Sequence, residues 1–142
     1  MHRLLAEAID SLARGIERSS RPEDRKLVGN YLAALAPVLA RAVLGQDILR
    51  ALPDIDRLFD QTRLVDSAPF DDAFSKWRAF KAEYSKSVLG GMTVNERLSA
   101  TDQLEAFDRA RAACDQDEVR RLLRDVLVDE TAIERIVRDL NG

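Results

Sequence analysis

Histidine and cysteine, which often take part in catalysis and metal binding, are scarce in this chain of 142 residues. It has one cysteine, Cys114, and one histidine, His2. One cysteine excludes an internal disulfide, and two such side chains are too few for a zinc site, which needs several histidine or cysteine ligands. His2 lies at a terminus, where chains usually fray, and the carboxylates of Asp115 and Asp117 beside Cys114 disfavour its thiolate. We therefore interpret Cys114 as a structural thiol and expect no metal and no cofactor.

Sequence motifs of the common enzyme classes are missing as well. The chain has no glycine-rich phosphate loop, no Walker lysine, no nucleophile elbow and no helical Glu-x-x-His metal motif. The closest carboxylate clusters are Asp54 with Asp56 and Asp71 with Asp72, and each is expected in the first turn of a helix. Neighbouring helical residues point about 100° apart, and a carboxylate in a first turn is favoured by the helix dipole. We interpret both clusters as caps and predict that the protein is not an enzyme.

Long apolar runs and an excess of positive charge are also lacking. The longest apolar run, Tyr31 to Ala40, is about half of the ~20 residues that a membrane-spanning helix needs. The N-terminus continues into an acidic amphipathic segment, unlike a signal or transit peptide. The formal net charge of −3 gives no general attraction to nucleic acids or acidic lipids. We expect a cytoplasmic protein that does not bind membranes, and nucleic acid is not the partner that we expect first.

What the chain does contain is a series of apolar residues at helical spacing. The first stripe runs from Leu4 to Ile16 and predicts a helix over about residues 3–18. Further stripes of the same kind follow along the whole chain, and no segment alternates with a period of two for long enough to indicate a strand. The sequence therefore predicts an all-α protein, a compact bundle of about six to seven helices.

The second helix is expected to differ from the others. It should cover about residues 22–44, and from Tyr31 to Leu44 it is apolar on nearly every face. A helix that is apolar all round is usually buried, so we interpret it as the central helix of the bundle. Pro37 removes a backbone donor within it, which predicts a kink, and Gly45 is a suitable stop at its end.

Helix-start signals divide the rest of the chain. Asp47 is expected to cap a short helix, residues 61–68 to form a loop, and Pro69 to begin a helix that ends near Val88. Three segments have the spacing of a capping box, in which a side-chain oxygen and a carboxylate each accept a backbone N–H. These pairs are Ser20 with Glu23, Thr93 with Glu96, and Asp115 with Glu118. With a tight turn at Asp129, the last two predict a C-terminal three-helix unit.

Gly90-Gly91 is the one pair of adjacent glycines and the best candidate for a hinge. One interpretation is a glycine stop between two helices of a single helical domain, residues 1–142. The other is a seam that joins a helical body, residues 1–89, to a three-helix module, residues 92–142. The sequence leaves both interpretations open.

The segment that follows this glycine pair has a distinctive beginning. From Met92 it reads M-T-V-N-E-R-L, and it continues with L-E-A-F-D from Leu104 and R-R-L-L from Arg120. Residues 92–142 resemble a group of short, uncharacterised bacterial helical proteins that open with the same M-T-V-N-E-R-L string. The other strings are generic amphipathic helix. The resemblance implies that residues 92–142 can form a unit of their own, and it carries over no catalytic or binding residue.

The helix expected before the glycine pair carries a mainly aromatic stripe over residues 70–88, at steps of four and three: Phe70, Phe74, Trp77, Lys81, Tyr84 and Val88. Such spacing is what a buried helix requires, so core packing is one interpretation. Lysines are rarely fully buried, however, and the presence of Lys81 indicates that the later half of the stripe lies near the surface. The second interpretation is a surface that binds an acidic helix or peptide. Its residues would be Lys76, Trp77, Lys81 and Tyr84.

These observations favour a non-enzymatic helical protein that acts by protein–protein interaction, with another protein or a copy of itself. Its role would be accessory, regulatory, antitoxin-like or immunity-like. A nucleic-acid-binding regulator is one alternative, because residues 117–127 and 130–140 predict two helices joined by a tight turn. The second of these helices begins with acidic residues, Asp129 and Glu130, which repel phosphates. The other alternative is a small-molecule-binding helical domain with a pocket beside Pro37.

Overall fold

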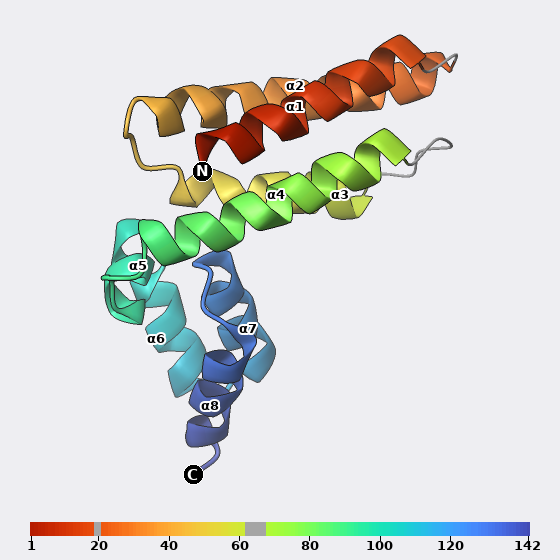
Figure 1. Cartoon of the computed structure of the whole chain (residues 1–142). Helices are drawn as coiled ribbons and strands as arrows, with labels where there is room; N and C mark the ends of the chain where they lie inside the picture. The colour runs from red at the N-terminus through yellow and green to blue at the C-terminus, as the bar shows by residue number, and fades with distance from the viewer. Residues whose placement is uncertain (19–20, 62–67) are drawn as a thin grey trace. The chain divides into compact units, whose positions relative to one another are not determined.

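The computed structural model describes residues 1–18, 21–61 and 68–142. Over these ranges it is built from helices and contains no strand, which confirms the all-α prediction (Figure 1). Eight α-helices are described, together with one short 3-10 helix, η1. In chain order they are α1 His2–Arg18, α2 Pro22–Val43, η1 Leu49–Ala51, α3 Leu52–Gln61, α4 Ala68–Ser87, α5 Val94–Ala100, α6 Leu104–Ala112, α7 Gln116–Asp125 and α8 Glu130–Leu140.

The chain divides into two compact units, Met1–Lys86 and Ser87–Gly142. The boundary lies a few residues before the glycine pair that the sequence marked as a hinge. Neither Gly90 nor Gly91 is among the glycines with positive φ, so the backbone does not require a glycine at either position. Independent folding of residues 92–142 stays a prediction.

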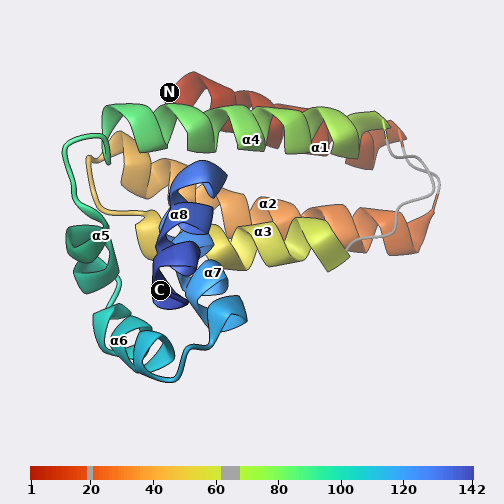
Figure 2. The same ribbon diagram turned by 90° about the horizontal axis from the view of Figure 1, so that it is seen from below.

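The first unit arranges its helices in two layers. α1 and α2 form an antiparallel hairpin in one layer, and α3 and α4 lie side by side in the other (Figures 1 and 2). An ion pair of 3.2 Å between the N-terminal ammonium of Met1 and Glu83 joins the start of α1 to the last turns of α4. The buried apolar residues come from all four helices and from η1 with the residue before it: Leu5, Ala8, Leu12, Val28, Tyr31, Leu35, Val38, Ala42, Ile48, Leu49, Leu52, Ile55, Phe59, Ala73, Trp77, Phe80 and Tyr84.

Helix α2 is not the buried central helix that its composition suggested. Only one stripe of it is buried, and the opposite face is exposed, including Pro37. The helix continues through Pro37 without a break. Most of the apolar residues on its exposed face are alanines, which have the highest helix propensity and little apolar area to bury. An all-apolar composition made of alanine therefore does not require burial on every side.

Four helices end with the same pair of backbone hydrogen bonds, the Schellman motif, around a residue in the left-handed conformation. After α2 this residue is Gly45, with φ 70°, as expected for a glycine stop. Here the N–H of Gln46 donates to the carbonyl of Arg41 at 2.9 Å. The other three left-handed residues are not glycines: Asp102 with φ 55°, Cys114 with φ 53° and Leu127 with φ 59°.

The stop at Asp102 explains why the C-terminal unit has more helices than predicted. The predicted three-helix unit has a single helix between the start signals at Thr93 and Asp115, but the chain turns after Ala100 and a new helix begins at Leu104. The N–H of Gln103 donates to the carbonyl of Leu98 at 2.8 Å, which closes the turn. The unit therefore contains four helices, α5 to α8, and not three. An aspartate tolerates the left-handed conformation better than most residues, which is the only local signal for this stop.

The predicted caps are largely as expected where the structure describes them. Thr93 and Glu96 form a complete capping box, and the side chains of Asp115 and Asp129 accept backbone N–H groups at the starts of α7 and α8. Asp47 accepts the N–H of Leu49 at 2.9 Å. Ser20 of the first predicted box lies outside the described residues, as does most of the predicted loop over 61–68.

A substitution at Cys114 tests the cost of a left-handed residue that has a side chain. We expect Cys114→Gly to raise the free energy of unfolding by about 0.5–1 kcal/mol, because glycine has no Cβ to strain at this φ. Cys114 is exposed, so little packing is lost. The measurement is urea unfolding followed by circular dichroism. Cys114→Ala keeps the Cβ and is the control. Equal stability of the two variants would contradict the prediction.

Candidate functional site

The aromatic stripe of α4 packs into the first unit through a connected series of ring contacts. Phe59 of α3 lies between α2 and α4, with its ring centroid 4.9 Å from that of Tyr31 and 5.3 Å from that of Phe74. The Trp77 centroid lies 6.4 Å from that of Phe59 and 5.6 Å from that of Phe80. These separations are typical of packed aromatic pairs. Of the two interpretations left open by the sequence, core packing describes the position of the stripe.

Trp77 and Tyr84 therefore do not form the exposed aromatic surface of the second interpretation. Trp77 is 0% exposed and Tyr84 is 5% exposed. Trp77 faces α3, and the Tyr84 hydroxyl lies near Asp47 before η1, and neither contact can be read from the spacing of α4 alone. The four residues that were predicted to bind a partner are instead held by contacts within the chain.

Lys81 and Trp77 share one carboxylate. The indole Nε1 of Trp77 donates to Oδ1 of Asp56 at 2.7 Å, and Nζ of Lys81 donates to both oxygens of Asp56, at 2.7 and 2.9 Å. The Lys81 ammonium also lies 6.0 Å from the centroid of the Trp77 ring, at the edge of cation–π distance. Asp56 thus satisfies the buried indole N–H and neutralises the one lysine of the stripe. This cluster joins α3 to α4.

Lys76 is paired in a similar way with α1. Its Nζ lies 3.0 Å from Oε2 of Glu7, and both side chains are partly exposed. The hydrogen bond from Lys76 and a second one from Arg3 hold the pKa of Glu7 below its usual value. The acidic groups that these lysines were expected to find on a partner are supplied by α1 and α3 of the same chain. From the sequence, Asp56 had been interpreted as a helix cap.

Both tyrosines of the first unit are buried and keep their protons. Tyr31 donates to the backbone carbonyl of Leu58, and the Tyr84 hydroxyl lies 3.5 Å from Oδ1 of Asp47. Burial, reinforced by Asp47, raises the pKa of Tyr84 to about 12. Burial, reinforced by Asp60, likewise raises the pKa of Tyr31 to about 12.

These tyrosines predict a loss of stability at alkaline pH. A tyrosine with a folded pKa above its unfolded pKa of about 10 stabilises the fold fully below about pH 10, and this contribution is lost as the pH rises toward 12. We expect the free energy of unfolding to fall over this range, and less steeply in Tyr84→Phe. Urea unfolding at several pH values measures this fall in the free energy of unfolding. An absorbance titration of tyrosinate follows the ionisation of the tyrosines in the folded protein. Ionisation of every tyrosine near its ordinary pKa in the folded protein would contradict it.

The remaining candidate residues, which are the two carboxylate clusters and Cys114, do not come together in one site. Asp54 pairs with Arg57 at 2.6 Å while Asp56 faces α4, and Asp72 accepts a hydrogen bond from Ser11. Cys114 is exposed, with no pairing cysteine. In the part of the chain that the structure describes, no group of three or more His, Cys, Asp or Glu residues could hold a metal ion. The sequence interpreted both clusters as caps, but Asp56 and Asp72 accept hydrogen bonds from side chains of other helices, and Asp54 pairs with a residue of its own helix.

The arginines of α7 bear on the nucleic-acid alternative. Arg120 pairs with Glu134 at 2.9 Å and Arg124 pairs with Glu130 at 2.7 Å, so two ion pairs join α7 to α8. Arg121 pairs with Glu118 at 2.6 Å on α7 itself. A guanidinium that is already paired with a carboxylate is a poor ligand for a phosphate. This face therefore gives no support to nucleic-acid binding.

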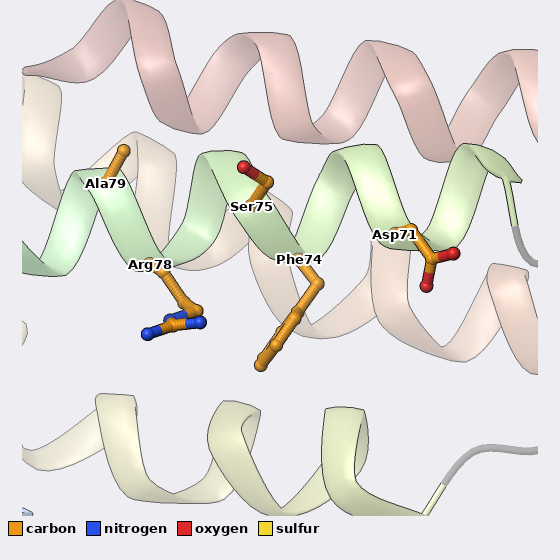
Figure 3. A pocket seen from close by; sticks show the side chains of 5 residues that line it. All are labelled: Asp71, Phe74, Ser75, Arg78 and Ala79. Atoms are coloured by element: carbon orange, nitrogen blue, oxygen red, sulfur yellow. The ribbon is translucent and has the colours of Figure 1, made fainter.

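A pocket of about 380 Å³ lies along α4. It is a shallow depression lined by Asp71, Phe74, Ser75, Arg78 and Ala79. Figure 3 shows the side chains of Asp71, Phe74 and Arg78 on one side of α4, while Ser75 and Ala79 point to the other. The Arg78 guanidinium lies 5.8 Å from the centroid of the Phe74 ring. The pocket is lined by α4 alone and does not include Pro37, so it is not the pocket beside Pro37 that the small-molecule alternative predicted.

The exposed face of α2 is a feature of the first unit that these contacts leave unexplained. We call it the outer face of α2; it comprises the partly buried Gly29 and the exposed residues Ala33, Ala36, Pro37, Ala40, Val43 and Leu44. Val43 is 61% exposed and Leu44 is 72% exposed. Among the described helices, α2 alone is long and apolar enough to cross a membrane by length and composition. Core helices of soluble proteins pass the same test, and α2 has a buried stripe, so this is weak support for a membrane role.

Comparison with protein-family models, with curated proteins and with solved structures finds no match to this chain. The resemblance of residues 92–142 to uncharacterised bacterial proteins stays an expectation, and the function is argued from the residues themselves.

Proposed function

We propose that this protein acts in the cytoplasm, without catalysis, by binding another polypeptide through the outer face of α2. The observation that carries the proposal is the exposure of Val43 and Leu44, at 61% and 72%, at the end of a face that is uncharged from Gly29 onward. The charged residues Arg25 and Lys26 lie on the same side of the helix, one turn before Gly29. Contiguous exposed apolar surface is a common mark of protein interaction sites.

The spacing of the outer face supports a helix as the partner. Gly29, Ala33, Ala36, Ala40 and Val43 follow one another at steps of four, three, four and three residues. These are the steps of the contact seam between two packed helices. Because most of the side chains are small, the backbone of a second helix can approach closely. The partner is a second copy of this chain or a separate helical protein.

The composition of the outer face favours a protein over a lipid surface. Helices that lie on membranes insert large apolar residues and carry lysines or arginines on the opposite side. Here the middle of the face consists of alanines and Pro37, which contribute little apolar area to lipid.

The experiment compares association of the wild-type chain with that of Ala40→Glu. Sedimentation velocity over a concentration series detects self-association, and a photo-crosslinking residue at position 36 captures a separate partner in the source cells. We expect one of the two methods to detect a complex of the wild-type chain. The complex should be lost in Ala40→Glu, because a carboxylate in the seam is desolvated without a counter-charge.

Ala82→Glu is the matched control, since Ala82 is an exposed alanine on α4 outside the outer face. It should leave the complex intact. A monomer that forms no crosslink at position 36 would refute the proposal. Flotation of the wild-type chain with anionic vesicles, lost in Ala40→Glu, would replace the protein partner with a membrane.

A further inference from the structure

The C-terminal unit contains a pocket that the proposed function does not use. Its core is formed by Leu98, Phe107, Ala110, Val119, Leu122, Leu123, Val126, Ile133 and Val137. At one edge of this core, α5, α6 and α8 line an open pocket of about 260 Å³. This lies just below the range of about 300–1,000 Å³ that is typical of drug-sized ligands, so its occupant is small.

The floor of this pocket is apolar. Phe107 of α6 is 4% exposed, and Val94 of α5 with Ile136 and Leu140 of α8 are partly buried against the core of the unit. Three helices thus present aromatic and aliphatic surface to the same space. A ligand that fills it gains by removing this surface from water.

The rim of the pocket carries three polar side chains of different character. Asn95 supplies an amide, Arg111 a guanidinium and Asp139 a carboxylate. Arg111 also lies over Phe107, with its guanidinium carbon 5.7 Å from the ring centroid. Among the described residues neither Arg111 nor Asp139 forms an ion pair, whereas Arg120, on α7, is bound by a carboxylate of α8. One cation and one anion therefore border the same apolar space without neutralising each other.

We propose that this pocket binds a small zwitterion with an apolar side chain, an α-amino acid such as leucine or phenylalanine. Arg111 presents paired N–H donors to the ligand carboxylate, a geometry that guanidinium and carboxylate share. Asp139 accepts the ligand ammonium, and Asn95 hydrogen-bonds at the rim. The apolar side chain lies on the floor formed by Phe107 and its neighbours. The site belongs wholly to the C-terminal unit, so it is independent of the outer face of α2.

The test is an NMR titration of the full-length protein with L-leucine and, separately, with L-phenylalanine. We expect saturable shifts of the resonances of Val94, Ile136 and Leu140. Glycine, which lacks the side chain, leucinamide, which lacks the carboxylate, and 4-methylpentanoate, which lacks the ammonium, should each bind on the order of tenfold more weakly or not at all, a factor that ~1.4 kcal/mol produces.

Variants separate the roles of the two charges. Arg111→Gln and Asp139→Asn should each weaken leucine binding on the order of tenfold, corresponding to ~1.4 kcal/mol. Arg109→Gln and Asp108→Asn are the controls, because they remove one positive and one negative charge from α6 at positions outside the pocket. Absence of saturable shifts up to the solubility of both amino acids would overturn the proposal. Equal binding of 4-methylpentanoate and leucine would also overturn it, since Asp139 would then have no role.

Discussion

Trp77→Ala is expected to lower the free energy of unfolding by about 3–5 kcal/mol, the range for removing a buried aromatic side chain. The indole is fully buried, touches the rings of Phe59 and Phe80, and donates to Asp56. Its removal leaves a cavity between α3 and α4 and takes one partner from the Asp56 cluster. Urea unfolding followed by circular dichroism measures the change, because fluorescence is lost with the only tryptophan.

Trp77→Phe separates the packing of the ring from its hydrogen bond. This variant keeps an aromatic ring but has no N–H for Asp56, so we expect a smaller loss of about 1–2 kcal/mol. The same pair of variants decides between the two interpretations of the stripe. If Trp77→Ala left the free energy of unfolding unchanged but abolished binding to a partner, the result would contradict core packing and assign Trp77 to an interface.

Arg97→Ala is expected to have the second largest effect, about 2–3 kcal/mol, because hydrogen bonds to charged groups are stronger than neutral ones and several are lost together. The Arg97 guanidinium donates to the carbonyls of Val126 and Leu127 at 3.3 and 3.1 Å, where α7 ends, and to that of Leu89 at 2.9 Å. A cation at a helix C-terminus also interacts favourably with the helix dipole. Burial lowers the pKa of Arg97, with Asp129 opposing the shift.

Hydrogen exchange of the α7 amides, with urea unfolding, measures this effect in the C-terminal unit. Arg97→Lys should recover only part of the loss, since one ammonium cannot donate to three carbonyls with the fork geometry of a guanidinium. Arg109→Ala is the control, because Arg109 is exposed and forms only a 4.0 Å pair with Glu105. Equal exchange rates in Arg97→Ala and Arg109→Ala would show that Arg97 does not hold the end of α7.

The helices and most of their ends follow from the local sequence. Apolar spacing defines α1 and α2 to within a residue or two, and the oxygens of Thr93, Asp115 and Asp129 start three of the later helices. These signals are readable because a cap joins residues only three positions apart. The stop at Asp102 was missed because its sequence resembles a continuing helix. Only the backbone conformation, with φ 55°, reveals it.

The partners of the site residues were decided by tertiary structure. Lys81 is separated from Asp56 by 25 positions, and Lys76 from Glu7 by 69, so no local pattern links them. The spacing of α4 gave the face on which Trp77 lies, and the packing of α3 against that face made it core. For the outer face of α2 the difference runs the other way. Its composition suggested burial, but no described element covers it. A residue pattern specifies which face of a helix is apolar, whereas the arrangement of the other helices determines which faces water still reaches.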